Sequence, residues 1–278
     1  MNAETLFRNI IKKKSYLCVG LDTDYNKIPK ALLDAPYPIY EFNRRIVDAT
    51  ADFAVAYKPN LAFYESLGAA GAMSLEMTLS YIREHYPDLF LIADAKRGDI
   101  GNTSRMYAHA YFRTLDCDAI TLSPYMGHDS ISPFLESENR WVVLLALTSN
   151  PGSGDFQQLE LADGSRLFEA VIRTSAAWGN VNNTMYVVGA TKASDMAHIR
   201  TIIPEHFLLV PGVGAQGGSL QEVASHGMND RCGLLVNASR SILYADGTNK
   251  FDQAARKEAE QLQKAMATTL REKGLLED

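Results

Sequence analysis

Opposite charges lie close together in one six-residue stretch of the chain, Asp-Ala-Lys-Arg-Gly-Asp at positions 94–99, directly after the apolar run 89–93. If that run is a β-strand, successive side chains alternate between its faces, so Asp94 and Lys96 project to the same side. A lysine ammonium can deliver a proton, and a neighbouring carboxylate can orient it or destabilise an anionic substrate. The spacing therefore predicts an acid–base pair at a strand end.

The end of the same stretch predicts the start of a helix. Gly98 ends the strand, and Asp99 is expected to be the helix N-cap, four residues before Thr103. Taken alone, such a stretch is more often a surface ion pair followed by a capped helix than a catalytic site. The context favours a site, because the chain repeats the same strand–loop–helix arrangement many times.

The elements that would position these charges are eight short apolar runs. Most lack polar alternation, as expected of parallel strands buried on both faces. The predicted strands cover 16–21, 53–57, 89–93, 119–122, 141–147, 185–188, 207–210 and 233–236, and the predicted helices cover 39–52, 75–86, 103–115, 130–136, 166–178, 194–203, 218–225 and 251–273.

This alternation predicts an α/β fold, a (β/α)8 TIM barrel, with a doubly wound open sheet as the alternative. No linker or shift in composition divides the chain. We therefore expect a single domain over residues 1–278 that ends in a long helix over about 251–273.

Composition restricts the class of partner. The chain has 278 residues, 46% of them hydrophobic and 22% charged, and a formal charge of -6. That charge offers no basic surface for nucleic acid, and the longest basic run, Lys12-Lys13-Lys14, is predicted to be the solvated end of a first helix. No apolar run is long enough to cross a bilayer, and the N-terminus lacks a signal peptide, so we expect no membrane partner and a cytoplasmic location.

The metal-binding patterns are also missing from the sequence. The three cysteines, Cys18, Cys117 and Cys232, are widely spaced in or beside apolar segments, which indicates buried thiols. We find no His-x-x-x-His, Cys-x-x-Cys or three-carboxylate set, so no metal is expected. Ser149 is not predicted to be a nucleophile, because its surroundings, Thr-Ser-Asn-Pro-Gly, differ from the Gly-x-Ser-x-Gly elbow.

Polar residues follow the predicted strands at their carboxyl ends, where TIM barrels carry their chemistry. The glycines of the 211–218 loop allow close backbone approach to a ligand, and a guanidinium one strand later can pair two phosphate oxygens. We expect a phosphate between these last two strand ends. The residues at strand ends are Asp22, Lys58, Asn60, Asp94, Lys96, Ser149, Gln216, Ser239 and Arg240.

Together these motifs resemble those of the orotidine 5′-phosphate decarboxylase family, in its longer bacterial subgroup. The resemblance runs from about Val19 to Ile242. The matching motifs are Gly20-Leu21-Asp22, Lys58-Pro59-Asn60, the Asp-x-Lys-x-x-Asp signature at 94–99 continued by Ile100 and Thr103, Ser149-Asn150-Pro151-Gly152, the glycine loop 211–218 and Ser239-Arg240.

The resemblance implies cofactor-free decarboxylation of orotidine 5′-monophosphate to uridine 5′-monophosphate, the last step of pyrimidine synthesis. It implies that Lys96 protonates C6, with Asp94 near the substrate carboxylate and Lys58 completing the charge array. It places the other site residues around the nucleotide: Asp22 and Asn60 near the ribose, Ser149 near the pyrimidine, Pro151 and Ile100 beside the substrate, and Gln216, Ser239 and Arg240 at the phosphate. It also implies a homodimer in which Asp99 and Thr103 reach the neighbouring subunit's site.

Two other functions remain open from the residues. A metal-dependent aldol or decarboxylase enzyme acting on 3-keto sugar phosphates would need an acidic ligand where Lys58-Pro59-Asn60 stands. A non-catalytic phosphosugar-binding protein would need the phosphate loop but not the three charges at 94–99. The insertion 153–165 is expected to be either a lid or a dimer surface.

Overall fold

Eight parallel strands of the chain close into a barrel. The structure, a computed structural model, describes residues 1–214 and 217–277. Within these residues each strand pairs with the next in chain order, and β8 returns to pair with β1. The predicted TIM barrel is confirmed, and the open-sheet alternative is wrong because the first and last strands are paired. The strands are β1 Leu17–Gly20, β2 Ala54–Lys58, β3 Phe90–Arg97, β4 Ala119–Leu122, β5 Trp141–Leu147, β6 Thr184–Val188, β7 Phe207–Pro211 and β8 Leu234–Ala238.

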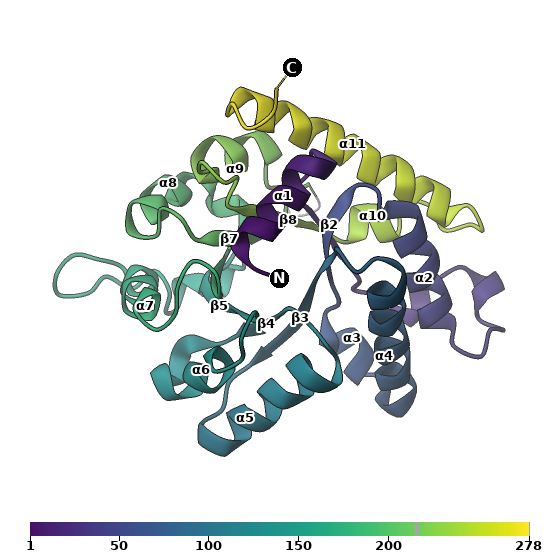
Figure 1. Cartoon of the computed structure of the whole chain (residues 1–278), viewed down its shortest axis with the longest axis horizontal. Helices are drawn as coiled ribbons and strands as arrows, with labels where there is room; N and C mark the ends of the chain where they lie inside the picture. Colours follow the sequence, from purple (N-terminus) through teal and green to yellow (C-terminus); the bar gives the residue numbers. More distant parts are fainter. Residues whose placement is uncertain (215–216, 278) are drawn as a thin grey trace.

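Helices surround the barrel (Figure 1). Each helix predicted from the sequence is present, and two short ones, α3 and α10, were not predicted. Among the described residues, no helix combines the length and apolar character that crossing a membrane requires. The helices are α1 Ala3–Lys13, α2 Pro38–Thr50, α3 Leu61–Glu65, α4 Gly68–His85, α5 Gly101–His109, α6 His128–Leu135, α7 Leu167–Ala176, α8 Ala193–Ile202, α9 Leu220–Gly227, α10 Arg240–Leu243 and α11 Phe251–Glu272.

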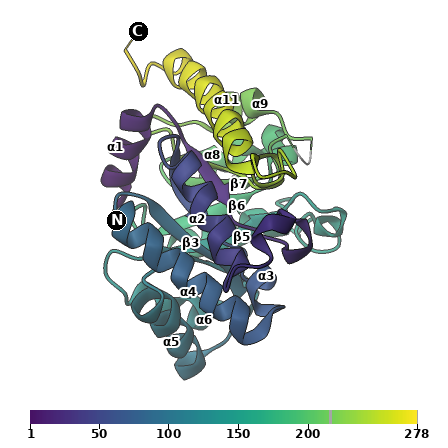
Figure 2. The same cartoon turned by 90° about the vertical axis from the view of Figure 1, so that its right-hand side faces the viewer.

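The long C-terminal helix α11 packs beside α2, far from it in the sequence (Figure 2). Phe251 stacks on Phe42 with ring centroids 4.7 Å apart. Arg45 and Asp252 form an ion pair of 2.7 Å between the same two helices. The end of the chain thus covers the barrel wall near β1.

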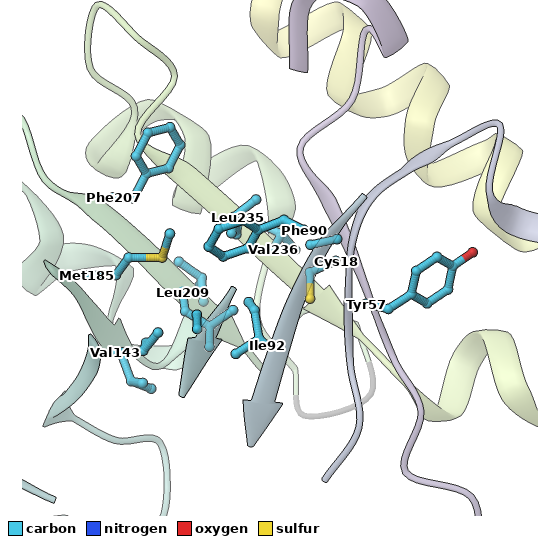
Figure 3. Packing of buried hydrophobic residues seen from close by; sticks show 14 of the residues in the cluster. Cys18, Tyr57, Phe90, Ile92, Val143, Met185, Phe207, Leu209, Leu235 and Val236 are labelled. Atoms are coloured by element: carbon cyan, nitrogen blue, oxygen red, sulfur yellow. The ribbon is translucent and has the colours of Figure 1, made fainter. Parts of the chain in front are cut away.

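Apolar side chains fill the inside of the barrel and the space between strands and helices. Figure 3 shows several of them, among them Ile92, Met185 and Leu209 from different strands. Cys18 is part of this core, and Cys117 and Cys232 are buried as well, all as free thiols. Burial raises the pKa of each thiol to about 12, so these cysteines are inert packing residues, as predicted.

The ladder between β3 and β4 contains a bulge at the motif that the sequence singled out. Ala93 pairs with Ile120 and Arg97 pairs with Leu122, which leaves residues 94–96 of β3 opposite Thr121 alone. Lys96 has a φ of 47°, in the left-handed region that few residues other than glycine adopt. A bulge of this kind bends a strand and redirects its side chains.

The boundaries around the motif differ from those predicted. The strand does not end at residue 93 but continues to Arg97. The prediction that Asp99 is the N-cap is wrong, because Ile100 is the N-cap of α5 and the Asp99 carboxylate accepts the N–H of Ile100 at 2.8 Å. The bulge adds two residues to β3 relative to β4, so the strand continues past residue 93 and the helix starts later than predicted.

Candidate active site

A cavity of about 350 Å³ opens at the carboxyl ends of the strands. It has an apolar floor and a polar rim, the usual construction of a small-molecule site. Its described lining residues are Asp22, Lys58, Asn60, Asp94, Lys96, Thr121, Leu145, Thr148, Ser149, Asn150, Val187, Leu209, Pro211, Gly212, Val213, Asn237, Ser239 and Arg240.

Asp94 is at the centre of a chain of alternating charges on one side of the cavity. One of its oxygens, Oδ2, accepts from Lys58 Nζ at 2.7 Å, and the other, Oδ1, accepts from Lys96 Nζ at 2.6 Å. Lys58 also lies 3.8 Å from Asp22. The prediction that Asp94 and Lys96 share a side of the strand is confirmed by their contact.

Burial and charge compete at these groups. Burial alone would raise the pKa of Asp94, but the ammonium groups of Lys58 and Lys96 outweigh it and hold that pKa well below its usual range. Burial alone would lower the pKa of Lys58, whereas Asp94 and Asp22 raise it above the ordinary lysine value. Both groups are therefore charged at neutral pH, and each is costly to bury without the other.

The opposite side of the cavity is built from the ends of β7 and β8. Ser239 and Arg240 follow β8, and Asn237 Nδ2 donates to Ser239 Oγ at 3.1 Å. A Cβ on Gly20, at the end of β1, would lie 1.9 Å from Ser239 Oγ, so only glycine leaves room for this serine. In the loop after β7, Gly212 and Gly214 have φ of 99° and 71°, in the left-handed region that glycine adopts readily, and Gly212 lines the cavity.

Most of the predicted site residues meet at this cavity. Asp99, Ile100, Thr103 and Pro151 lie outside its lining, and Gln216 lies outside the described residues. The predicted residues that line it are Asp22, Lys58, Asn60, Asp94, Lys96, Ser149, Ser239 and Arg240.

Four further residues line the cavity although the sequence analysis assigned them no role in the site: Thr121, Thr148, Asn150 and Asn237. Thr121 is the clearest case, because its hydroxyl donates to Asp94 Oδ1 at 3.0 Å and accepts the N–H of Lys96 at 2.9 Å. The available signal was a polar residue within the apolar run of β4. That signal is weak, since buried threonines are common in strands.

The inserted segment after β5 is tied to the rim by one side chain. Gln157 accepts the N–H of Thr148 at 2.7 Å and donates to its hydroxyl at 2.9 Å. That hydroxyl donates to Asn150 at 2.6 Å. Ser149, between them, lines the cavity, but its Oγ is buried against Gly189 without a hydrogen-bond partner.

The chain is similar to known proteins over most of its length. The model of a family described as "Orotidine 5'-phosphate decarboxylase / HUMPS family" matches residues 15–256. An orotidine 5′-phosphate decarboxylase of Bacteroides fragilis is 60% identical over 271 residues, 98% of this chain and 99% of the relative. One of Porphyromonas gingivalis is 61% identical over 276 residues, 99% of this chain and 100% of the relative.

A solved structure agrees with these relatives. OMP decarboxylase of Leishmania donovani superimposes with a TM-score of 0.80 at 36% identity and covers 96% of this chain and 99% of its own. The likeness therefore extends over the whole barrel and not only over the charged motif.

Proposed function

The chain belongs to the orotidine 5′-phosphate decarboxylase / HUMPS family. We propose that the cavity at the carboxyl ends of its barrel strands is the active site in which its nucleotide substrate is decarboxylated. The enzyme is an orotidine 5′-phosphate decarboxylase, a carboxy-lyase of the final step of pyrimidine biosynthesis. Its substrate is orotidine 5′-monophosphate, and its products are uridine 5′-monophosphate and carbon dioxide.

The observation that carries the assignment to this cavity is the Lys58–Asp94–Lys96 array. When the bond from C6 to the carboxylate breaks, its electron pair stays on C6 and carbon dioxide leaves. A fixed ammonium beside C6 stabilises that charge more in the transition state than in the ground state. Lys96 then gives a proton to C6 and regains one from solvent, so the step needs no cofactor.

Asp94 and Lys58 support this step in different ways. The Asp94 carboxylate, which is ionised, repels the substrate's carboxylate and orients Lys96. Lys58 neutralises Asp94 from the other side and is itself buried, which keeps the array rigid. Rigid placement of charges avoids reorganisation at the moment of reaction.

The remaining residues are proposed to hold the nucleotide. Ser239, Arg240 and Gln216 bind the phosphate, and Asp22 and Asn60 bind the ribose. Ser149, which lines the cavity, meets the pyrimidine, and Pro151 lies beside the substrate. Binding energy from the phosphate, remote from C6, can then be used to close the glycine loop over the substrate.

The arrangement of Lys58 argues against the metal-dependent alternative. A divalent cation at Asp22 and Asp94 would meet the ammonium of Lys58, which lies 2.7 Å from one carboxylate and 3.8 Å from the other. Two unit charges about 4 Å apart repel by about 4 kcal/mol in partly screened surroundings, and the double charge of the cation would double that repulsion. The non-catalytic alternative leaves the buried charge array without a purpose.

We further propose a homodimer, in which Asp99 and Thr103 reach the partner's cavity and Ile100 lies between them. These residues lie outside the cavity of their own chain, and the apolar side chain of Ile100 is exposed. Met106 and Tyr125 are exposed apolar side chains on neighbouring segments, as expected of a surface that another subunit covers. A cytoplasmic location is proposed as well, supported by three free thiols, which are usual in reducing compartments.

Carbon dioxide release from orotidine 5′-monophosphate in the presence of a chelator tests the function. We expect full turnover without added metal. Turnover that the chelator abolishes and magnesium restores would support the metal-dependent alternative, and nucleotide binding without release of carbon dioxide would support the non-catalytic one.

A further inference from the structure

We propose that Thr121 is a positioning residue for the decarboxylation, an inference that rests on the function proposed above. Its hydroxyl joins Asp94 to the backbone of Lys96 across the β3–β4 bulge. It is not proposed to touch the substrate. Instead, Thr121 sets the relative position of the Asp94 carboxylate and the Lys96 ammonium, which do contact the substrate.

The bulge creates the need for such a residue. Because residues 94–96 face Thr121 alone, they cannot all make ladder hydrogen bonds with β4. The N–H of Lys96 is bonded instead to Thr121 Oγ1 at 2.9 Å. A side chain therefore replaces a strand backbone as the partner of the catalytic lysine.

The direction of both hydrogen bonds is determined by the chemistry of the groups. A backbone N–H can only donate, and an ionised carboxylate can only accept. The Thr121 hydroxyl must therefore accept from Lys96 and donate its one proton to Asp94 Oδ1, which is 3.0 Å away. The same oxygen accepts from Lys96 Nζ at 2.6 Å, so Thr121, Asp94 and Lys96 form a closed ring of contacts.

This ring also holds an unfavourable backbone conformation. Lys96 has a φ of 47°, which costs free energy for a residue with a Cβ and persists only where the surroundings enforce it. On the other side of Lys96, Ser123 N donates to Arg97 O at 2.9 Å. The turn at Lys96 is therefore fixed on both sides, by the hydrogen bond from the Lys96 N–H to Thr121 and by the hydrogen bond from Ser123 to the carbonyl of Arg97.

The Thr121 hydroxyl is buried, so its hydrogen bonds are to protein groups and not to bulk water. Thr121 is only 1% exposed although it borders the cavity. Replacing it with valine keeps the shape and removes both hydrogen bonds. The N–H of Lys96 is then left unpaired, and the turn is free to relax.

Thr121→Val tests the proposal through steady-state kinetics of decarboxylation. We expect kcat to fall roughly 10- to 100-fold while KM and the affinity for the product uridine 5′-monophosphate stay within about 2-fold, because the nucleotide-binding residues are unchanged. Thr121→Ser, which keeps the hydroxyl, is expected to recover most of kcat. A purely structural role would lower the melting temperature without this split between kcat and KM.

Thr184→Val is the matched control. Thr184 is equally buried, begins β6 at the opposite end of the barrel and donates its hydroxyl to Asn183 at 3.1 Å. The kcat of the Thr184→Val enzyme should equal that of the wild type. If Thr121→Val does not fold, Thr121→Cys takes its place, because a thiol fills similar space and donates poorly.

Two results would overturn the proposal: a Thr121→Val enzyme with wild-type kcat, or a Thr121→Ser enzyme as slow as the valine variant. A wild-type enzyme that releases no carbon dioxide would instead refute the proposed function, so the two failures are distinguishable.

Discussion

Asp94 and Lys96 are in contact but differ in exposure: the side chain of Asp94 is 9% exposed, whereas that of Lys96 is 49% exposed, with 2.6 Å between Oδ1 and Nζ. The buried member of the pair is held on its other oxygen by Lys58 and does not depend on Lys96 alone for its charge balance. The exposed member is available to the cavity. The difference in exposure therefore assigns a structural role to Asp94, which holds the charge array together, and a chemical role to Lys96, which can reach the substrate.

Lys96→Ala is therefore expected to abolish turnover while the fold survives. The loss should be ~10³-fold or more in kcat, because both the proton donor and the charge beside C6 are removed. Carbon dioxide release and thermal melting measure the two effects. Lys264→Ala, at an exposed helix position paired only with Glu260, is the control and should retain full activity. An active Lys96→Ala enzyme would contradict the mechanism.

Asp94→Asn is expected to change the pH dependence of stability. The folded pKa of Asp94 is depressed below its unfolded value of about 3.9, so its contribution is fully present above that value and is lost as pH falls further. At neutral pH the variant leaves Lys58 buried with a weaker partner, and we expect a loss of about 3 kcal/mol. Urea unfolding between pH 2 and pH 7 should show the difference from wild type shrinking below about pH 4. A difference that stays constant with pH would contradict the ion-pair origin.

Arg240→Ala should weaken substrate binding much more than it slows the chemical step within the bound complex. Two charge-assisted hydrogen bonds to a phosphate are together worth enough to raise KM about 100-fold. Isothermal titration with uridine 5′-monophosphate measures the binding loss directly. Arg231→Ala, at the other end of the barrel, is the matched control. Unchanged affinity for the nucleotide would show that the phosphate binds elsewhere.

Mixed dimers test whether Asp99 serves the neighbouring site. Lys96→Ala and Asp99→Ala homodimers should each be nearly inactive. After mixing and subunit exchange, one of the two sites in each mixed dimer contains neither substitution, so about a quarter of wild-type activity should return. Activity that stays at the level of the parents, with exchange verified by mass spectrometry, would place Asp99 in the site of its own chain.

Gln157→Leu should disturb the rim rather than the chemistry. The variant removes both hydrogen bonds to Thr148, whose hydroxyl in turn holds Asn150 at the cavity. We expect KM to rise several-fold, roughly 5-fold, with a smaller change in kcat. Gln158→Leu is a close control, because the Gln158 amide donates to Ser153, within the inserted segment, and not to Thr148. Equal kinetics in both variants would leave the inserted segment without a role at the rim.

The strands were predictable from the sequence because continuous apolar runs such as 141–147 are typical of parallel strands buried on both faces, and eight of them alternating with helices favoured a barrel. The strand-end residues were predictable for the same reason, since parallel strands bring their carboxyl ends to one rim. The N-cap at Asp99 was wrong, because the sequence pattern does not reveal how many residues a bulge consumes. Thr121 was missed since its importance depends on strand register, and α3 because five residues carry too little periodicity.

The bulge in β3 makes the spacing within the charged motif as important as its residue types. Three residues opposite one is an arrangement that a single deletion would undo, turning Lys96 away from the cavity even if every charged residue were retained. A designer who transplants the motif into another barrel must carry both strands together, with Thr121 opposite residues 94–96, because the six-residue signature is only half of a two-strand unit.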